Sequence, residues 1–175
     1  MVSGDGCLQE GVASEACSLA GTQELGNLIL LWDDNHISIE DDTNIAFTED
    51  VLARFAAYGW HTQRVNWLGD DGSYAEDVTA LDAALDAAEA ETRRPTLIVL
   101  KTVIGWPSPR KQNTGGIHGA ALGTEELRGL KKALDVDPDA AFAVDDDVIA
   151  HTRDLRTRGA EARAAFIDHW RLEEG

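Results

Sequence analysis

Residues 28–35 read Leu-Ile-Leu-Leu-Trp-Asp-Asp-Asn, a continuous apolar run that ends in three polar side chains. An apolar run of strand length without polar alternation is typical of a parallel strand covered on both faces. Upstream, residues 4–6 read Gly-Asp-Gly, and a helix-like segment over residues 10–20 separates the two stretches. The order strand, helix, strand predicts that both polar stretches follow parallel strands of one sheet.

The rest of the chain continues this alternation and then becomes irregular. We expect further strands at residues 2–3, 61–67 and 96–100, and helices at residues 48–58 (with Thr48 as the N-cap), 75–90 and 124–134. This order predicts an α/β fold with a doubly wound parallel sheet and right-handed crossovers. Residues 104–121 form a long loop rich in Gly and Pro, and loops of that length are usually functional or mobile. Residues 148–172 predict a charged helix with a thin apolar stripe.

Composition excludes several classes of function. The chain has 175 residues and a net charge of −17, which argues against nucleic acid and against anionic membrane surfaces as partners. Its apolar runs are all shorter than the roughly 20 residues that a membrane span needs. A secretory signal is not visible, so a cytoplasmic protein is expected. Cys7 and Cys17 are predicted to be free thiols of a reducing compartment.

The two polar stretches predict a site for Mg²⁺ and a diphosphate. The carboxyl ends of parallel strands are where ligands bind in this architecture. Mg²⁺ prefers oxygen ligands, which the Asp5 carboxylate, the Asn35 side-chain oxygen and the Ile37 carbonyl can supply. Gly6 lets a diphosphate approach the backbone. Taken alone, each stretch also fits an ordinary turn; the pair around one strand is much more specific.

Several separated motifs, in order, resemble the thiamine diphosphate-binding part of transketolases. They lie at residues 4–11, 15–21, 33–39, 55–60, 101–109 and 118–123. The resemblance covers residues 2–134 strongly. Residues 1–134 therefore look like the C-terminal part of a cofactor-binding domain, and residues 135–175 look like the acidic linker and helix that lead to a pyrimidine domain.

The resemblance implies a role for seven residues. Asp5, Asn35 and the Ile37 carbonyl match metal ligands, for Mg²⁺ or alternatively Ca²⁺ or Mn²⁺; Gly6, Asn35, Ile39 and His118 match cofactor contacts; and His118 and Glu10 match residues with catalytic roles, Glu10 at a subunit interface. Plainer readings stay open, because Ile37 and Ile39 could be core, Glu10 an ordinary helix-start acid and His118 a surface histidine. His36 stands where the family commonly has Gly, and Arg110 where it commonly has Asn. Lys101, Arg110 and Lys111 either meet a sugar phosphate or are simply solvated.

The function that the resemblance implies is transfer of a two-carbon ketol unit from a ketose phosphate to an aldose phosphate, in the pentose phosphate pathway. The expected partners are sugar phosphates and either a second copy, in a homodimer, or a chain that carries the pyrimidine domain. The family's domain has a long portion before the Gly-Asp-Gly motif. We therefore expect a fragment that is inactive alone, with an exposed sheet edge beside Gly4 and marginal stability.

Two alternatives remain at this point. One is another thiamine diphosphate enzyme, such as a deoxyxylulose-phosphate synthase or a 2-oxoacid dehydrogenase component. Residues 101–109 and 118–123 favour transketolase over these. The other is a non-catalytic interaction module that kept the fold and uses its terminal helix and acidic linker to bind partners.

Overall fold

A computed structural model describes residues 1–39 and 41–173, which form two compact units, Met1–Pro138 and Asp139–Gly175. The first unit contains a four-stranded, all-parallel sheet in the order β1-β2-β6-β5. Its strands are β1 (Val2–Gly4), β2 (Ile29–Asp34), β5 (His61–Asn66) and β6 (Thr96–Lys101). The predicted α/β class and parallel sheet are therefore confirmed, with β2 and β6 in the centre.

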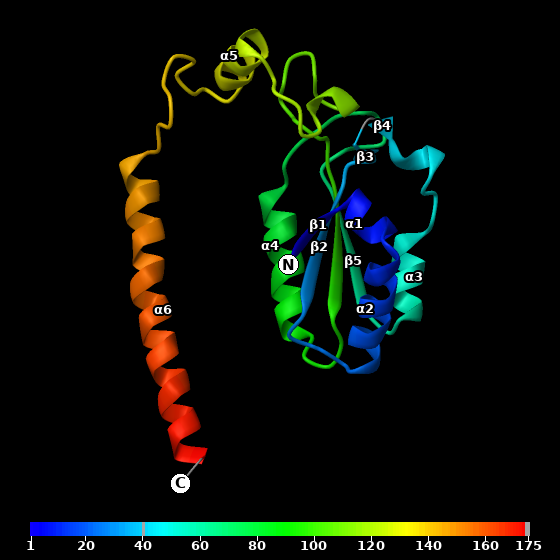
Figure 1. Cartoon of the computed structure of the whole chain (residues 1–175), viewed down its shortest axis with the longest axis vertical. Coiled ribbons are helices and arrows are strands. Elements are labelled where there is room, and N and C mark those ends of the chain that lie inside the picture. The colour runs from blue at the N-terminus through cyan, green and yellow to red at the C-terminus, as the bar shows by residue number, and fades with distance from the viewer. Residues whose placement is uncertain (40, 174–175) are drawn as a thin grey trace. The chain divides into compact units, whose positions relative to one another are not determined.

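Helices cover both faces of this sheet (Figure 1). On one face lie α1 (Asp5–Gln9), α2 (Gly11–Thr22) and α3 (Val51–Ala57), and on the other lies α4 (Val78–Ala90). Alternate residues of the central strands feed two separate cores. Leu30, Trp32, Leu97 and Val99 pack toward α2 and α3, whereas Ile98 and Leu100 pack toward α4 with Val65, Ala84 and Ala88. Burial on both faces explains the continuous apolar runs in the sequence.

The helices differ from the sequence prediction in three details. The predicted helix over residues 10–20 corresponds to α2, and α1 is an additional short helix before it, separated from α2 by the extended backbone of Glu10 (ψ 134°). The helix predicted over residues 75–90 begins at Val78. The N-cap of α3 is Asp50 and not Thr48, since the Asp50 carboxylate accepts a hydrogen bond from the backbone N–H of Ala53 over 3.0 Å. A carboxylate at this position also interacts favourably with the helix dipole.

Short elements surround the carboxyl end of the sheet. After β2 the chain forms a small antiparallel hairpin of β3 (Ile37–Ser38) and β4 (Asp41–Asp42), followed by the 3-10 turn η1 (Thr43–Ile45). After β6 comes the long predicted loop, which contains the 3-10 turn η2 (Gly115–Ile117), and then α5 (Thr124–Ala133). The turn η2 lies against β4, so two segments far apart in sequence meet at this end.

The second unit contains one long helix, α6 (Asp146–Glu173), close to the predicted charged helix. Several of its apolar side chains are exposed, among them Leu155, Phe166 and Trp170. In the part of the chain that the structure describes, none of the helices combines the length and apolar character needed to cross a bilayer.

Candidate metal and cofactor site

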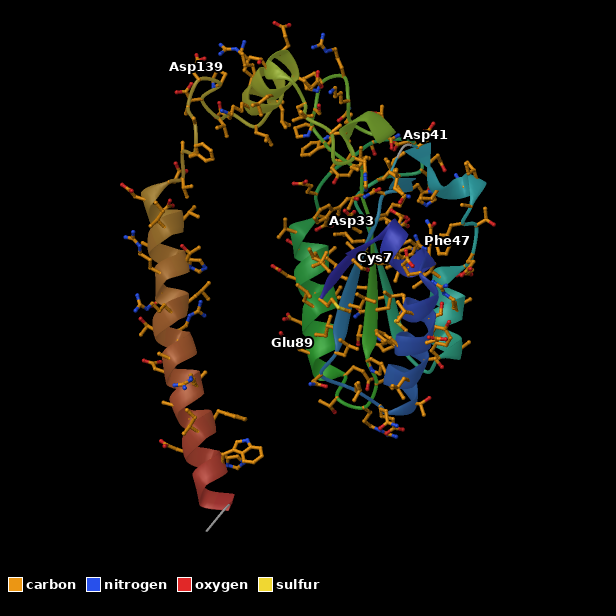
Figure 2. All side chains as sticks on the ribbon, in the orientation of Figure 1. Cys7, Asp33, Asp41, Phe47, Glu89 and Asp139 are labelled. Carbon is orange, nitrogen blue, oxygen red and sulfur yellow. The ribbon has the colours of Figure 1, made fainter. Side chains whose placement is uncertain are left out.

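The sheet register brings the predicted polar residues to one end of the sheet. Gly4 of β1 pairs with Asp33 of β2, and Asp34 pairs with Lys101 of β6. Figure 2 shows Asp33 and Asp41 toward the same end of the first unit, with Glu89 of α4 toward the opposite end. Because Asp5 follows β1 directly and Asn35 follows β2 directly, the parallel pairing sets the two residues beside each other.

Asp5 is a buried carboxylate at the first position of α1, with 3% of its surface exposed. Its Oδ2 accepts a hydrogen bond from the backbone N–H of Asn35 over 3.3 Å. Burial, together with repulsion from Asp34, raises the pKa of Asp5 to about 6. The negative charge of the buried carboxylate is therefore poorly stabilised, and a bound cation would stabilise it.

The Asn35 side chain is held in one orientation by its neighbours. Its Nδ2 donates to Asp33 Oδ2 over 3.3 Å, and its Oδ1 accepts from the backbone N–H of Ile37 over 3.0 Å. The hydroxyl of Thr102, at the end of β6, donates to the other oxygen of Asp33. Asp33 therefore orients the amide, while Thr102 holds Asp33; the role of Thr102 was not visible in the sequence.

Asp34 differs from Asp5 because three basic side chains lie around it. Its carboxylate lies 3.1 Å from His36 Nε2, 3.6 Å from Lys101 Nζ and 3.7 Å from Arg64 Nη1. Lys101, one of the candidates for a sugar-phosphate contact, thus directs its ammonium group to Asp34. Among the described residues, Asp34 forms ion pairs with basic side chains, whereas Asp5 forms none within 4 Å.

The β3–β4 hairpin covers the start of α1. A Cβ atom on Gly6 would lie 3.1 Å from Ser38 Oγ, so a glycine at this position allows the hairpin to approach closely. Ile37, in β3 of the hairpin, is buried, whereas Ile39 is 72% exposed and has a left-handed backbone with φ of 59°. A β-branched residue in this conformation is strained. The Ile39 side chain is thus an exposed apolar group two residues after Ile37.

The remaining two predicted residues lie outside this cluster. His118 follows η2 in the loop after β6, with its side chain exposed, and η2 in turn lies against β4. Glu10 is exposed at the break between α1 and α2. Among the described residues, neither side chain makes a hydrogen bond with Asp5 or Asn35. The structure therefore brings Asp5, Gly6, Asn35 and Ile37 together, with Ile39 exposed on the hairpin that begins at Ile37.

The donor set at this end is mixed in chemistry. Within residues 1–39 and 41–173, no three His, Cys, Asp or Glu side chains are grouped so that they could hold a metal ion. A cation here would need the carboxylate of Asp5, the amide oxygen of Asn35 and a main-chain carbonyl. An all-oxygen set with one carboxylate suits Mg²⁺ that keeps water or phosphate oxygens in its other positions. The residues present therefore fit a divalent cation bound together with a diphosphate.

The family model and the related sequences that match this chain agree on one family. Residues 1–172 match the family model described as the thiamine diphosphate binding domain of transketolase. The chain is 49% identical over 173 residues to the transketolase of Mycobacterium tuberculosis (strain ATCC 25618 / H37Rv), covering 99% of this chain and 23% of that protein. It is 48% identical over 160 residues to the transketolase of Nostoc sp., covering 91% of this chain and 23% of that protein.

Solved structures give the same result for the fold. The transketolase of Leishmania mexicana superposes with a TM-score of 0.82 at 41% identity, over 93% of this chain and 23% of that chain. A transketolase of Pichia stipitis in complex with sedoheptulose-7-phosphate superposes with a TM-score of 0.78 at 44% identity, over 94% and 24% of the two chains. The chain thus spans about a quarter of the length of these relatives.

Proposed function

Because the chain belongs to the transketolase family, and matches its thiamine diphosphate-binding domain, we propose that it binds the diphosphate of that cofactor through a divalent cation. The cation, Mg²⁺ or alternatively Ca²⁺ or Mn²⁺, is held by Asp5, the Asn35 amide oxygen and the Ile37 carbonyl. One observation carries this proposal: the start of α1, directly after β1, and the loop after β2 are joined by the hydrogen bond from the Asn35 N–H to Asp5 Oδ2.

The electrostatics of Asp5 support a cation at this position. Its pKa is raised by burial and by Asp34, and Asp34 already has its own cationic neighbours. A divalent ion beside Asp5 would remove the cost of the buried charge. The Asn35 amide is fixed with its Nδ2 on Asp33, and its Oδ1, which accepts one hydrogen bond from the Ile37 N–H, keeps a second lone pair for a cation.

The other predicted residues have roles around the same end of the sheet. Gly6 gives the diphosphate access to the backbone, and the exposed Ile39 offers an apolar surface to the ring system of the cofactor. His118 reaches the diphosphate and the reacting centre from the loop after β6, where it stabilises developing negative charge and moves protons. Glu10, exposed between α1 and α2, contacts a second subunit.

The reaction that we propose is transfer of a two-carbon ketol unit from a ketose phosphate to an aldose phosphate. Thiamine diphosphate supplies the carbanion chemistry when it is bound, and the protein supplies orientation and electrostatics. This chain contributes the residues that hold the diphosphate end and one histidine near the reacting atoms. Because it spans about a quarter of its relatives, we propose that catalysis needs a homodimer or a complex with a chain carrying the pyrimidine domain.

A thermal melt of the purified chain tests the binding proposal. Tryptophan fluorescence is followed with thiamine diphosphate alone, with Mg²⁺ alone and with both. A ligand present at about 100 times its dissociation constant stabilises the folded state by about 2.7 kcal/mol. We expect an upward shift of the melting temperature that needs both components and disappears in Asp5→Ala.

A matched control uses Asp86, an exposed carboxylate on α4. Asp86→Ala should keep the full shift, because the residue lies away from the carboxyl ends of the strands. An equal shift in Asp5→Ala and Asp86→Ala would contradict the assigned ligands. A cooperative melt of the wild-type chain with no response to the two components together would contradict cofactor binding by this chain alone.

A further inference from the structure

One buried carboxylate outside the proposed metal site gathers four hydrogen bonds from the loop after β6. Glu126, in the first turn of α5, is only 3% exposed. Its Oε1 accepts from Ser108 Oγ over 2.5 Å and from the backbone N–H groups of Arg110 and Lys111 over 2.7 and 3.1 Å. Its Oε2 accepts from Arg110 Nε over 3.0 Å. All four donors belong to residues 108–111.

Among the four hydrogen bonds to Glu126, the one from Ser108 is the most protected from solvent. Ser108 is fully buried, whereas the Arg110 side chain is 69% exposed and its ion pair with Glu126 is open to screening by solvent. The Ser108 hydroxyl, followed by the backbone N–H of Arg110, the Arg110 side chain and the backbone N–H of Lys111, lowers the pKa of Glu126 to about 2. Bonds from a hydroxyl and two backbone N–H groups fix the position of the main chain itself.

Residues 108–111, which Glu126 holds and which we call the clamped segment, are linked in turn to both sides of His118. Before the histidine, Thr114 Oγ1 donates to the Lys111 carbonyl over 2.7 Å. After it, Lys111 Nζ donates to the Ala121 carbonyl over 3.2 Å. Lys111, whose N–H is held by Glu126, therefore contacts the loop on either side of His118.

Close packing limits the loop at two further points. A Cβ atom on Gly129 of α5 would lie 2.9 Å from Pro109 Cγ, so the helix backbone lies directly against the clamped segment. A Cβ atom on Gly105 would lie 2.0 Å from Ile117 Cδ1, so the start of the loop packs on the residue before His118. The loop therefore has a defined shape although most of it is irregular.

We infer that Glu126 is a positioning residue, which fixes the loop of residues 102–123 so that His118 is presented beside the β3–β4 hairpin. Its role in cofactor binding rests on the function proposed above for His118. Its role in holding the loop does not depend on that function. Glu126 itself makes no contact with the cluster around Asp5 among the described residues, so it acts through the loop.

Hydrogen exchange of the whole 175-residue chain tests the positioning role directly. The variant is Glu126→Gln, which keeps the size of the side chain but removes the charge and replaces one acceptor oxygen with a donor. The matched control is Glu125→Gln, because Glu125 is exposed in the same turn of α5. We expect amides of residues 110–121 to exchange about tenfold faster in Glu126→Gln than in the wild type.

The same measurement separates positioning from general destabilisation. Amides of β2 and β6 should exchange at wild-type rates in both variants, and Glu125→Gln should match the wild type throughout. Unchanged exchange over residues 110–121 in Glu126→Gln would overturn the inference. Equal acceleration in the loop and in the central strands would overturn it as well, since the residue would then support only the fold.

Cofactor affinity provides the second readout. The chain is titrated with thiamine diphosphate at saturating Mg²⁺, using His118→Ala, Glu126→Gln and the double variant. If Glu126 acts through His118, each single variant weakens binding several-fold and the double variant is no weaker than His118→Ala. Additive losses, or wild-type affinity in Glu126→Gln, would overturn the inference. Absence of binding by the wild-type chain would count against the proposed function, while hydrogen exchange would still decide the positioning role.

Discussion

Asp5 and Asn35 are thirty residues apart in sequence, yet the Asn35 backbone N–H donates to Asp5 Oδ2 over 3.3 Å. The contact exists because β1 and β2 are parallel neighbours in register, with Gly4 paired to Asp33. It joins the start of α1 to the loop after β2, with a carboxylate and an amide residue side by side at the carboxyl end of the sheet. This pairing underlies the metal site that we propose.

Asn35→Asp should destabilise the metal-free chain by about 1–3 kcal/mol. The substitution removes the amide donor to Asp33 and adds a negative charge next to Asp33 and Asp5. Urea unfolding at neutral pH, followed by fluorescence, measures the change. The control is Asn66→Asp at the exposed end of β5, which should change the free energy of unfolding by less than about 0.5 kcal/mol. Equal losses in the two variants would count against the local repulsion.

Gly21→Ala should cost about 3 kcal/mol of unfolding free energy, because overpacking against backbone forces α2 away from the residues that end α3. The added Cβ atom would lie 1.9 Å from the Tyr58 carbonyl oxygen. Gly11→Ala, at the start of the same helix, meets no atom within 4 Å and should stabilise by up to about 1 kcal/mol. Opposite signs are expected in urea unfolding; a stabilising Gly21→Ala would show that α2 can shift freely.

Trp60→Phe should destabilise the chain by about 2–3 kcal/mol. The Trp60 indole is buried, packs edge-on against Phe55 with ring centroids 5.0 Å apart, and donates from Nε1 to the Cys17 carbonyl over 2.8 Å. Phenylalanine removes the buried indole hydrogen bond to that carbonyl and opens a small cavity. Trp67→Phe removes a similar bond, to the Asp77 carbonyl, that is exposed to solvent. We expect Trp67→Phe to cost less than about 1 kcal/mol, and comparable losses would contradict the burial argument.

The contribution of Glu126 to stability should depend on pH. Its pKa in the folded chain is lowered from 4.5 to about 2, chiefly by the Ser108 hydroxyl bond. A lowered folded-state pKa means that the stabilisation is complete above pH 4.5 and disappears as the pH falls toward 2. The difference in unfolding free energy between the wild type and Glu126→Gln should therefore be constant from pH 5 to 8 and shrink below pH 4.5. Urea unfolding across this range measures it, and a difference that persists unchanged at pH 2 would refute the charge-based account.

The elements that were predicted correctly are those with a strong local pattern. Residues 28–32 and 96–100 are apolar without interruption, and both became central strands because only a strand buried on two faces accommodates such a run. The boundaries that failed depended on competition between neighbours. Asp50 replaced Thr48 as a cap because its carboxylate bonds the Ala53 N–H, and both residue types are good caps in sequence.

For the candidate site, the sequence identified the residues that follow the strands, but it did not show how they are supported. Thr102 and Glu126 were invisible because each acts on a partner far away in the chain, Thr102 on Asp33 and Glu126 on residues 108–111. Glu126 looked like an ordinary acidic residue in the first turn of a helix. Glu125, its neighbour in the same turn, has the same chemistry but is exposed. Glu126 is buried and hydrogen-bonded only because α5 packs against the loop.

The sequence by itself determined the parallel α/β class, the order of the main elements and the position of Asp5 and Asn35 at the ends of strands. It could do so because hydrophobic periodicity and the residues that end helices and strands are local properties of the chain. The tertiary structure decided which carboxylates carry compensated charge. Asp34 is paired with His36, Lys101 and Arg64, whereas Asp5 is buried, forms no ion pair with another described residue, and has a raised pKa. That difference arises from the register of strands distant in sequence and from the loss of water around each group, neither of which a local pattern encodes.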